Sequence, residues 1–593
     1  MEKKNTFCAF CSMQCDLKVR MPEVAPYFTE DGIMQQDFDT DNVNQGSICA
    51  KGNFTVDYIN HPERLSYAER RHNRVTTEEA FDRIKAGFSR ILEKHGKDSI
   101  GIIANGNVSR EEITWLERLA RDGFNTKNLG FFLPDDGMVA AGLMATGYKF
   151  DRPSIDDLEK ADNALIVGDA FFEHPVLAKK VLQARYESRK HMMVVVDPYY
   201  SNTAWFADVH LQCFPGAEGL VLMALASLTI DKKDTEFTKM LAKLNIDDIA
   251  DRAGVKVGDL KWAADIIKGS ENLSIIISDI IGKIGQADVC AAYCNLIAEG
   301  DRSKRHFYPV FINQSVYPIA SLMAENNIAG AGQVLDGVNK GKIKGLLVLG
   351  VDLSSSFSSG EMDKALKNLE FLCCSETFIN DTTLHADIVL PAANPLEKEG
   401  TFTDLDGKNK IRDHLINPPS AGMADVDIIK SLYTMFASSE DMPGDDSFED
   451  LKEIPKVDSY EKIVVDNARK LQKFNKITTG KYPFAFISKA LATHWSDGSL
   501  TRKFIWNKEN ADEPVFEIHP SAAEKLNIKE GQKITVESQA GRAKLPVLFS
   551  ERMQEDMVAA CYHWSDVRRI FPLDLAKGTG EISNEPIPVQ VRK

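Results

Sequence analysis

Four cysteines near the start of the chain constrain its fold more than any other feature. Cys8, Cys11 and Cys15 follow the spacing C-x2-C-x3-C, and 33 residues separate Cys15 from Cys49. Three thiolates on one tight loop, with a fourth from a returning segment, can supply one ligand to each iron of a [4Fe–4S] cubane. Nearby backbone N–H groups can hydrogen-bond the sulfurs. The spacing therefore favours an iron–sulfur cluster.

Two other interpretations fit the same four residues. A structural zinc site also takes four thiolates, although zinc knuckles usually show two C-x2-C pairs. The thiols could also have no ligand role. Clustered cysteines in a reducing compartment indicate metal ligation more than disulfides. The other six of the ten cysteines lie within apolar segments: Cys213, Cys290, Cys294, Cys373, Cys374 and Cys561.

Composition narrows the class of protein. The chain has 593 residues, 43% hydrophobic and 27% charged, which is a globular composition with room for roughly three to five domains. Its net charge of -16, with no Lys/Arg-rich run, argues against nucleic-acid binding. No apolar stretch approaches the ~18–20 residues of a membrane span, and the first residues lack a secretory or twin-arginine signal. We therefore expect a cytoplasmic protein.

The middle of the chain alternates short apolar runs with amphipathic segments. A helix is predicted from the capping residues Thr76 and Thr77 to about Lys94. Such alternation predicts parallel sheets with crossover helices, and ligands of these sheets bind at the carboxyl ends of the strands. The predicted strands cover residues 99–104, 164–168, 193–198, 273–277 and 346–350.

The cysteine segments resemble those of a known family. F-C-A-F-C-S-M-Q-C-D-L and G-S-I-C-A-K-G are similar to the cluster segment of the molybdopterin-dinucleotide oxidoreductases. That family includes formate dehydrogenases, nitrate reductases and the related large subunit of respiratory complex I. Lys51 matches a lysine that lies between cluster and pterin in the family, which implies an electron relay; a surface lysine is the alternative.

Four predicted strand ends resemble the dinucleotide-binding turns of the family. Residues 168–175 are similar to G-x-N-P-x-x-x-H-P and residues 195–198 to V-V-D-P, with residues 207–208 about ten positions later; residues 215–218 are similar to P-G-T-D, whose acid recognises guanine. A carboxylate suits guanine because it can accept from both N1–H and the exocyclic amine. Helix capping is the alternative role for a lone acid. The resemblance implies these cofactor-binding residues: Gly168, Asp169, Glu173, His174, Asp197, Pro215, Gly216 and Glu218.

The second half repeats this pattern. Residues 346–352 predict a strand and phosphate loop with Gly350 and Asp352, and residues 371–378 predict a strand with Glu376 at its end. Residues 386–393 and 397–403 look like the A-D-V-V-L-P-A…E-K-x-G-T-F motif of the family. The following D-L-D-G-K departs at three positions from its N-x-E-G-R.

The C-terminal region changes to short strands and turns. Strands are predicted at residues 515–520, 532–537 and 541–548, with a short helix and then a tight turn within 523–531. This pattern resembles the β-barrel that closes over the dinucleotides in the family, as do residues 571–574, 578–581 and 588–591. Lys489, His494 and Thr501 are similar to its T-G-R-x-x-x-H…G-T-x-T-R segment, with Lys for the usual Arg, and are further predicted cofactor contacts.

The resemblance covers nearly the whole chain and implies an α/β, multi-domain molybdopterin-oxidoreductase fold. The expected cofactors are a [4Fe–4S] cluster on Cys8, Cys11, Cys15 and Cys49, and bis-molybdopterin guanine dinucleotide with molybdenum or tungsten. The expected parts are a [4Fe–4S] domain (1–60), a first doubly wound α/β domain (61–133 and 320–436), a second (134–319), a linker or insertion (437–480) and a C-terminal β-barrel cap (481–593).

Two family residues needed for formate chemistry are missing. The loop at residues 133–143 has no Cys or His, and Asp136 falls where the metal ligand would be. Asp136 is therefore a candidate Mo/W ligand; the alternative is that Asp135 and Asp136 cap a helix over residues 138–146. Met323 stands in place of the arginine in R-G-Q-N-N-x-x-G. Because formate needs a fixed cation in a dry site, we expect altered or lost formate chemistry.

Two functional hypotheses follow from the resemblance. In the first, the chain is the pterin-binding subunit of a cytoplasmic oxidoreductase complex. In the second, it is a non-catalytic electron-transfer or assembly subunit similar to the large subunit of complex I. Both imply partner subunits that carry iron–sulfur clusters or flavin, since one cluster cannot transfer a hydride to NAD and no G-x-G-x-x-G signature stands out.

Overall fold

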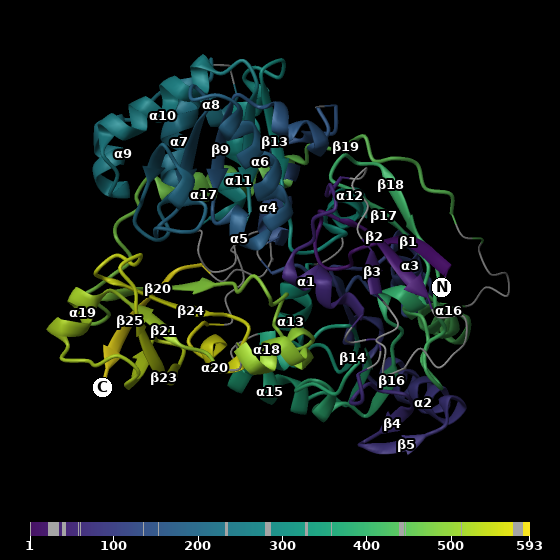
Figure 1. Cartoon of the computed structure of the whole chain (residues 1–593). Helices are drawn as coiled ribbons and strands as arrows, with labels where there is room; N and C mark the ends of the chain where they lie inside the picture. Colours follow the sequence, from purple (N-terminus) through teal and green to yellow (C-terminus); the bar gives the residue numbers. More distant parts are fainter. Residues whose placement is uncertain are drawn as a thin grey trace. The chain divides into compact units, whose positions relative to one another are not determined.

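The computed structural model describes residues 2–21, 35–37, 43–56, 59, 61–134, 136–151, 153–231, 235–278, 286–326, 330–356, 359–437, 444, 446–510, 513–572 and 585–593. The chain divides into two compact units, each built from segments far apart in the sequence (Figure 1). Unit 1 is Met1–Leu133, Asn313–Leu451 and Thr493–Asn510. Unit 2 is Pro134–Ile312, Lys452–Ala492 and Ala511–Lys593. No helix in the described ranges combines the length and apolar character that crossing a bilayer requires.

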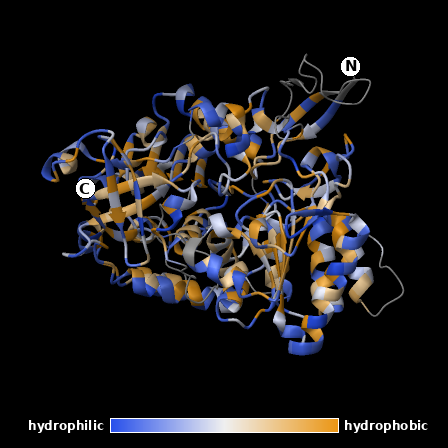
Figure 2. Ribbon diagram, turned by 90° about the horizontal axis from the view of Figure 1, so that it is seen from below, coloured by the Kyte–Doolittle hydropathy of each residue, from blue (hydrophilic) through white to orange (hydrophobic). Residues whose placement is uncertain are grey.

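A seven-stranded sheet of order β5-β4-β16-β15-β14-β6-β7 is the centre of unit 1. Its strands are β4 (Ala68–Arg70), β5 (Asn73–Val75), β6 (Ile100–Asn105), β7 (Leu129–Phe132), β14 (Gly345–Leu349), β15 (Phe371–Glu376) and β16 (Ile388–Pro391). The last five are parallel, and β4 and β5 are antiparallel. Apolar runs suit such strands because both faces are buried; Figure 2 colours the sheet strands mostly hydrophobic and the helices in both colours.

Capping residues explain where helices of unit 1 begin and end. The clearest is α2 (Thr77–His95): the Thr76 hydroxyl accepts from the Glu79 N–H at 3.1 Å, and Gly96 ends the helix at φ 82°. This confirms the helix predicted from Thr76 and Thr77. The others are α1 (Ala50–Asn53), α3 (Arg110–Arg118), α12 (Val316–Asn326), α13 (Ala331–Asn339), α14 (Leu353–Ser356), α15 (Ser359–Lys367), α16 (Asp425–Phe436) and α18 (Ile505–Asn510).

Two small antiparallel elements complete unit 1. The first is the sheet β1 (Glu2–Phe7), β2 (Asp16–Met21) and β3 (Gln35–Asp37), in which Phe7 faces Asp16 at the end of the β1–β2 ladder. The second is the hairpin β17 (Gly400–Thr403) and β18 (Asn409–Arg412). The sheet and the hairpin both hold residues of the candidate site in place.

A five-stranded parallel sheet of order β11-β10-β9-β12-β13 is the centre of the first part of unit 2. Its strands are β9 (Asn163–Val167), β10 (Met192–Val196), β11 (Val209–Leu211), β12 (Leu273–Ile277) and β13 (Arg305–Pro309). The helices are α4 (Asp136–Thr146), α5 (Ala170–Glu173), α6 (Pro175–Glu187), α7 (Glu218–Thr229), α8 (Glu236–Leu241), α9 (Ile246–Ala253), α10 (Val257–Gly269), α11 (Ala287–Glu299) and α17 (Asp458–Leu471). A short antiparallel pair joins β8 (Tyr148–Lys149) to β19 (Glu453–Ile454).

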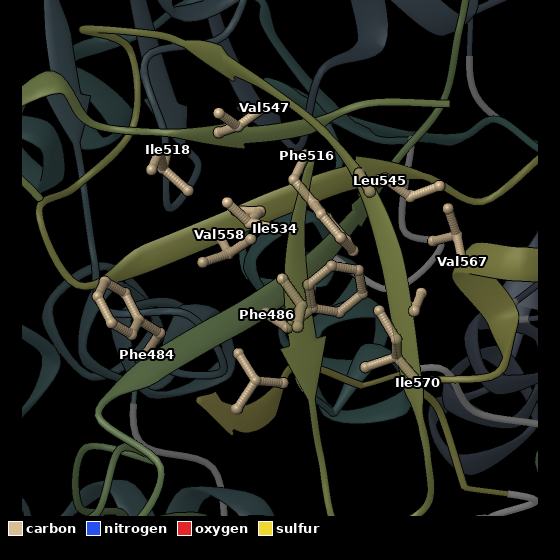
Figure 3. Packing of buried hydrophobic residues seen from close by; sticks show 14 of the residues in the cluster. Phe484, Phe486, Phe516, Ile518, Ile534, Leu545, Val547, Val558, Val567 and Ile570 are labelled. Atoms are coloured by element: carbon tan, nitrogen blue, oxygen red, sulfur yellow. The ribbon is translucent and has the colours of Figure 1, made fainter. Parts of the chain in front are cut away.

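The C-terminal part of unit 2 is a closed barrel of order β20-β24-β21-β23-β22-β25. Its strands are β20 (Phe484–Lys489), β21 (Phe516–Ile518), β22 (Lys533–Glu537), β23 (Arg542–Phe549), β24 (Met557–Cys561) and β25 (Ile587–Arg592), with helices α19 (Pro520–Lys525) and α20 (Ser565–Arg568). On β22, Ile534 and Val536 point into the core, as the two-residue period of a strand requires (Figure 3). The expected mixed α/β fold with two doubly wound sheets and a C-terminal barrel is confirmed.

The short helix of the barrel lies earlier than the sequence predicts. The prediction covers residues 523–531, whereas α19 begins at Pro520, where the missing N–H costs no hydrogen bond. The His519 side chain accepts from the Ser521 N–H at 3.1 Å. After the helix the chain adopts a positive φ of 53° at Asn527 and of 73° at Gly531, within the tight turn that the sequence predicts before the next strand.

Asp288, in the first turn of α11, should make stability depend on pH. It is fully buried and accepts hydrogen bonds at 2.8 Å from the Asn467 amide and the Val289 N–H. Burial nevertheless raises its pKa from 3.8 to about 6, because these bonds offset only part of the desolvation. The folded state therefore binds the proton more tightly than the unfolded state does.

This contribution is complete below pH ~4 and is lost as the pH rises through the folded pKa of about 6. The expected loss is up to about 3 kcal/mol of unfolding free energy. Denaturant titrations between pH 4 and 7 should show a flatter pH profile for Asp288→Asn than for the wild type. Asp265→Asn, which changes a carboxylate with 74% side-chain exposure, is the control. An unchanged profile in Asp288→Asn would contradict the assignment.

Candidate cofactor site

Three of the four N-terminal cysteines lie in the loop that joins β1 to β2. Cys8, Cys11 and Cys15 are buried, and the Cys8 N–H donates to the Cys15 carbonyl at 2.8 Å, which closes the loop. Gln14 takes a positive φ of 44° within it. Cys49 is the N-cap of α1, so the fourth thiol comes from a returning segment of unit 1.

The properties of this loop fit a cluster of four irons. Burial is the main cause that raises the pKa of Cys8, and the neighbouring Cys49 and Cys11 raise this pKa further. Burial is also the main cause that raises the pKa of Cys15, and Cys8, Cys11 and Cys49 add to the effect. The four sulfurs are therefore electrostatic neighbours. The Phe10 N–H hydrogen-bonds the Cys8 sulfur, as backbone donors do around cluster sulfurs.

Two residues beside Cys49 belong to this arrangement. A Cβ on Gly52 would lie 2.6 Å from the Ile48 side chain and 3.3 Å from the Cys8 sulfur, so only glycine fits without displacement. Lys51 is 1% exposed. This excludes the surface-lysine interpretation, and an electron-relay role stays a prediction.

A cavity lies at the carboxyl ends of the parallel strands of unit 1. It is lined by the residues that follow β6, β14, β15 and β16, together with Ala9 and Phe10 of the cysteine loop. Its empty volume, including space open to solvent, is about 1150 Å³. This is where ligands of doubly wound sheets bind.

Asp352 and Glu376 line this cavity, as does Gly350, where φ is 66°. The structure therefore brings together the three residues predicted from the second half of the chain. Burial raises the pKa of Glu376 well above its usual range, and Asp352 and Asp497 add to the effect. Glu376 Oε1 is buried and has no hydrogen-bond partner among the described residues. Such an acceptor fits the N–H edge of a guanine or pterin ring.

The sequence did not single out two further acids of the cavity wall, Asp425 and Asp497. Asp425 accepts from the Lys398 ammonium at 2.6 Å, and Lys398 also donates to Glu112 at 2.8 Å. Burial alone would lower the pKa of Lys398, but the two carboxylates outweigh it and raise the pKa. Lys398 follows Glu397 in the motif E-K-E-G-T-F, which was the available signal; Asp425 and Asp497 lie in no motif.

His494 and Thr501 belong to unit 1 with the cavity. His494 Nδ1 lies 2.8 Å from the Thr501 hydroxyl, and both side chains are buried. Lys489 belongs instead to unit 2, where it pairs with Glu517 at 2.8 Å. The structure therefore assigns the three residues of this predicted segment to two units.

The strand ends of unit 2 carry the other predicted turns. Gly168, at φ 86°, follows β9, and Asp169 accepts from the Thr203 N–H at 2.9 Å and its hydroxyl at 2.7 Å. Asp197 follows β10 and is fully buried. Gly168 and Asp169 therefore occupy the place after β9 that Gly350 and Asp352 occupy after β14.

The same arrangement occurs twice in the chain. Asp352 accepts from the Thr382 N–H at 3.0 Å and its hydroxyl at 2.8 Å, as Asp169 does from Thr203. The order β11-β10-β9-β12-β13 also matches β16-β15-β14-β6-β7 within the larger sheet. The two sheets therefore present equivalent glycine–acid turns at equivalent strand ends, and Asp169 and Asp352 both brace the loop after the next strand.

The remaining predicted residues of unit 2 are all buried or in tight turns. Glu173 and His174 are 3% and 2% exposed at the junction of α5 and α6. Pro215 precedes Gly216, which takes a φ of 88°, and Glu218 is fully buried in the first turn of α7. A buried acid at this position needs donors, which is compatible with a guanine contact but is not specific to one.

The two departures from formate dehydrogenases lie in ordered helices. Asp136 is 1% exposed and is the first residue of α4, while Asp135 lies outside the described residues. The helix therefore begins two residues before its predicted start, with Asp136 in its first turn, and ligation of Mo or W by Asp136 stays a prediction. Met323 is 5% exposed in α12, and no charge replaces the missing arginine at that position. Residues 327–329 of the same motif, and residues 573–584 of the closing segment, are outside the described ranges.

Comparison with known proteins gives consistent family matches. The family described as molybdopterin oxidoreductase matches residues 66–435, its Fe4S4 domain matches residues 1–61, and the Molydopterin dinucleotide binding domain matches residues 484–585. The F420-dependent formate dehydrogenase subunit alpha of Methanocaldococcus jannaschii is 24% identical, over 94% of each chain. The NADPH-Fe(3+) oxidoreductase subunit alpha of Geobacter sulfurreducens is 24% identical, over 94% of this chain and 71% of its own.

The overall fold also has a solved counterpart. The structure of acetylene hydratase from Pelobacter acetylenicus superposes with a TM-score of 0.77 over 100% of both chains, at 15% identity. This likeness concerns the fold alone. With one family match over residues 66–435 of 593, flanked by its Fe4S4 and dinucleotide-binding domains, this chain belongs to the molybdopterin oxidoreductase family.

Proposed function

We propose that this chain is the pterin-binding, cluster-carrying subunit of an electron-transfer complex, with altered or lost formate chemistry. The observation that carries the proposal is the shared wall in unit 1: Ala9 and Phe10 of the cysteine loop line the same cavity as Asp352 and Glu376. A group held by the loop and a group held by the strand ends would therefore be neighbours, which is the requirement for electron transfer between them.

The chain's own residues have separate tasks in this proposal. Cys8, Cys11, Cys15 and Cys49 would hold the cluster, and the buried Lys51 would relay electrons. The acids of the cavity wall, Asp352 and Glu376, would accept from the amino and ring N–H groups of guanine or pterin. When bound, the bis-pterin Mo or W centre supplies two-electron oxidation or reduction of a substrate, with Asp136 as its candidate protein ligand.

Metal analysis of the anaerobically purified chain tests this proposal. We expect about four irons per chain and near-stoichiometric Mo or W with a guanine-containing pterin. Zinc in a colourless protein would overturn it. Iron without Mo, W or pterin would instead support the non-catalytic subunit, which the missing cysteine, histidine and arginine also favour.

Formate oxidation should be weak or absent in metal-replete protein. Formate is a small anion that needs a buried cation to hold it, and Met323 offers none. A viologen-coupled assay at saturating formate is the measurement, with a formate dehydrogenase as the positive control. Brisk turnover would show that another residue supplies the cation and that the formate chemistry is intact.

Partner subunits are part of the proposal. One cluster accepts one electron at a time and cannot deliver a hydride, so a two-electron carrier requires a partner with flavin or further clusters. The relatives named above are alpha subunits, which favours the same organisation here. We expect such a partner to co-purify with the native protein.

A further inference from the structure

Arg412 holds a positive charge against the base of the cysteine loop. It is the last residue of β18 and is 2% exposed. Its guanidinium carbon lies 4.2 Å from the ring centre of Phe7 and 4.3 Å from that of Phe402, and the two rings meet edge to face. Because Phe7 directly precedes Cys8, this cation–π contact fixes the charge beside the first cysteine.

A glutamine connects Arg412 to the loop itself. The Arg412 guanidinium donates to Gln314 Oε1 at 3.1 Å. The amide nitrogen of Gln314 then donates to the Cys8 carbonyl at 2.6 Å and to the Cys11 carbonyl at 3.4 Å. This chain of hydrogen bonds orients both the arginine and the loop, so their separation is fixed by the fold.

The same strand presents a second cation to the loop. Lys410 lies two residues before Arg412 and therefore on the same face of β18, while Ile411 between them is 70% exposed. The Lys410 ammonium donates to the Gln14 carbonyl at 2.8 Å and also pairs with Asp16. It lies 4.9 Å from the Phe7 ring centre. One face of β18 thus places two positive charges, those of Lys410 and Arg412, beside the cysteine loop.

These charges act on the cysteine sulfurs. Arg412 is joined through Gln314 to the carbonyls of Cys8 and Cys11, and Lys410 donates to the carbonyl of Gln14, which directly precedes Cys15. A field that favours negative charge on the sulfurs also favours an added electron on a group bound to them. Salt screens such a buried charge weakly.

We propose that Arg412, assisted by Lys410, is a positioning residue that raises the reduction potential of the cluster bound to Cys8, Cys11, Cys15 and Cys49. The inference rests on the cluster in the proposed function. Reduction is one electron with no bond change, [4Fe–4S]2+ to [4Fe–4S]+, and takes the cluster with its four thiolates from a charge of about −2 to about −3. Net charge and hydrogen bonding near the sulfurs are established determinants of this potential.

A potentiometric titration of the full, cluster-replete chain tests the proposal. The reductant is dithionite with mediator dyes, and the readout is the EPR signal of the reduced cluster. In Arg412→Gln, which removes the charge, we expect the equilibrium constant for reduction to fall about tenfold, a shift of about 59 mV to more negative potential. Arg412→Lys, which keeps the charge, should shift by less than half as much.

The matched control is Lys408→Gln, because Lys408 lies on the same hairpin with 65% side-chain exposure. Its potential should equal that of the wild type; a shift equal to that of Arg412→Gln would overturn the proposal. So would an iron-replete Arg412→Gln with an unchanged potential, or equal shifts in Arg412→Gln and Arg412→Lys.

If the Arg412→Gln variant loses its iron, the reduction potential of the Lys410→Gln variant tests the proposal instead. A negative shift smaller than the one expected for Arg412→Gln supports the proposal, and an unchanged potential overturns it. Wild-type protein without iron would overturn the proposed function and this inference together. An iron-replete Arg412→Gln whose potential does not move overturns only the inference, so the two failures are distinguishable.

Discussion

Replacing Cys8 with alanine should remove the iron from this protein. We expect the iron content to fall from about four to below about one atom per chain, with loss of the charge-transfer absorption and of the reduced-state EPR signal. Cys8 is 4% exposed, and its sulfur accepts a hydrogen bond from the Phe10 N–H and lies 3.3 Å from where a Cβ on Gly52 would stand.

The matched control is Cys294→Ala. Cys294 is equally buried, but it lies in α11 of unit 2 and has no part in the loop. Its iron content should remain at the wild-type level. Four irons in Cys8→Ala would exclude the assigned ligand set, and loss of iron in both variants would indicate a general failure of folding.

Replacing Phe486 with alanine should destabilise the C-terminal barrel by about 3–5 kcal/mol. Phe486 is fully buried on β20, with ring centres of Phe571 and Phe516 at 5.3 and 6.3 Å. Figure 3 shows it with Phe516, Val558 and Ile534, which come from other strands of the barrel. The closed barrel cannot collapse around the resulting space, because each strand is hydrogen-bonded on both sides.

Denaturant unfolding followed by tryptophan fluorescence measures this effect, since Trp564 belongs to the same hydrophobic cluster. Leu548→Ala is the control: this residue lies on β23 but is 46% exposed, so its truncation should cost less than about 0.5 kcal/mol. Equal losses in the two variants would show that the barrel interior does not determine the stability of this domain.

The sequence predicted the parallel strands well because they are continuous apolar runs. β12 occupies residues 273–277 as predicted, and β6, β9, β10 and β14 lie within one or two residues of their predicted positions. β13 was missed because Arg305 and His306 make its sequence, R-H-F-Y-P, too polar for a buried strand. Arg305 is accommodated by hydrogen bonds to the carbonyls of Thr229 and Ile297, which no local pattern reveals.

The site was predictable where a motif is local and not where it depends on tertiary contacts. The cysteine spacing identified the loop, and Glu376 was found because it is the last residue of an apolar strand. Asp425 and Asp497 reach the cavity from distant segments, and Arg412 reaches the cysteine loop through Gln314, 98 residues away along the chain. The sequence around these residues does not distinguish them from ordinary surface residues, and only the fold shows that Asp497 and Arg412 are buried and that Asp425 lines the cavity.

The insertion of one α/β unit within the other has a consequence for synthesis on the ribosome. In the register of β6 and β14, Ile100 pairs with Gly345, so the larger sheet cannot form until the chain beyond the insertion has emerged. Its strand β16 ends only at Pro391, whereas the smaller sheet has all its strands once Pro309 is outside. The nascent chain therefore completes its smaller doubly wound sheet first, while the apolar strand β6, paired with β7 on one side, lacks its other partner β14 until more than two hundred further residues have been translated.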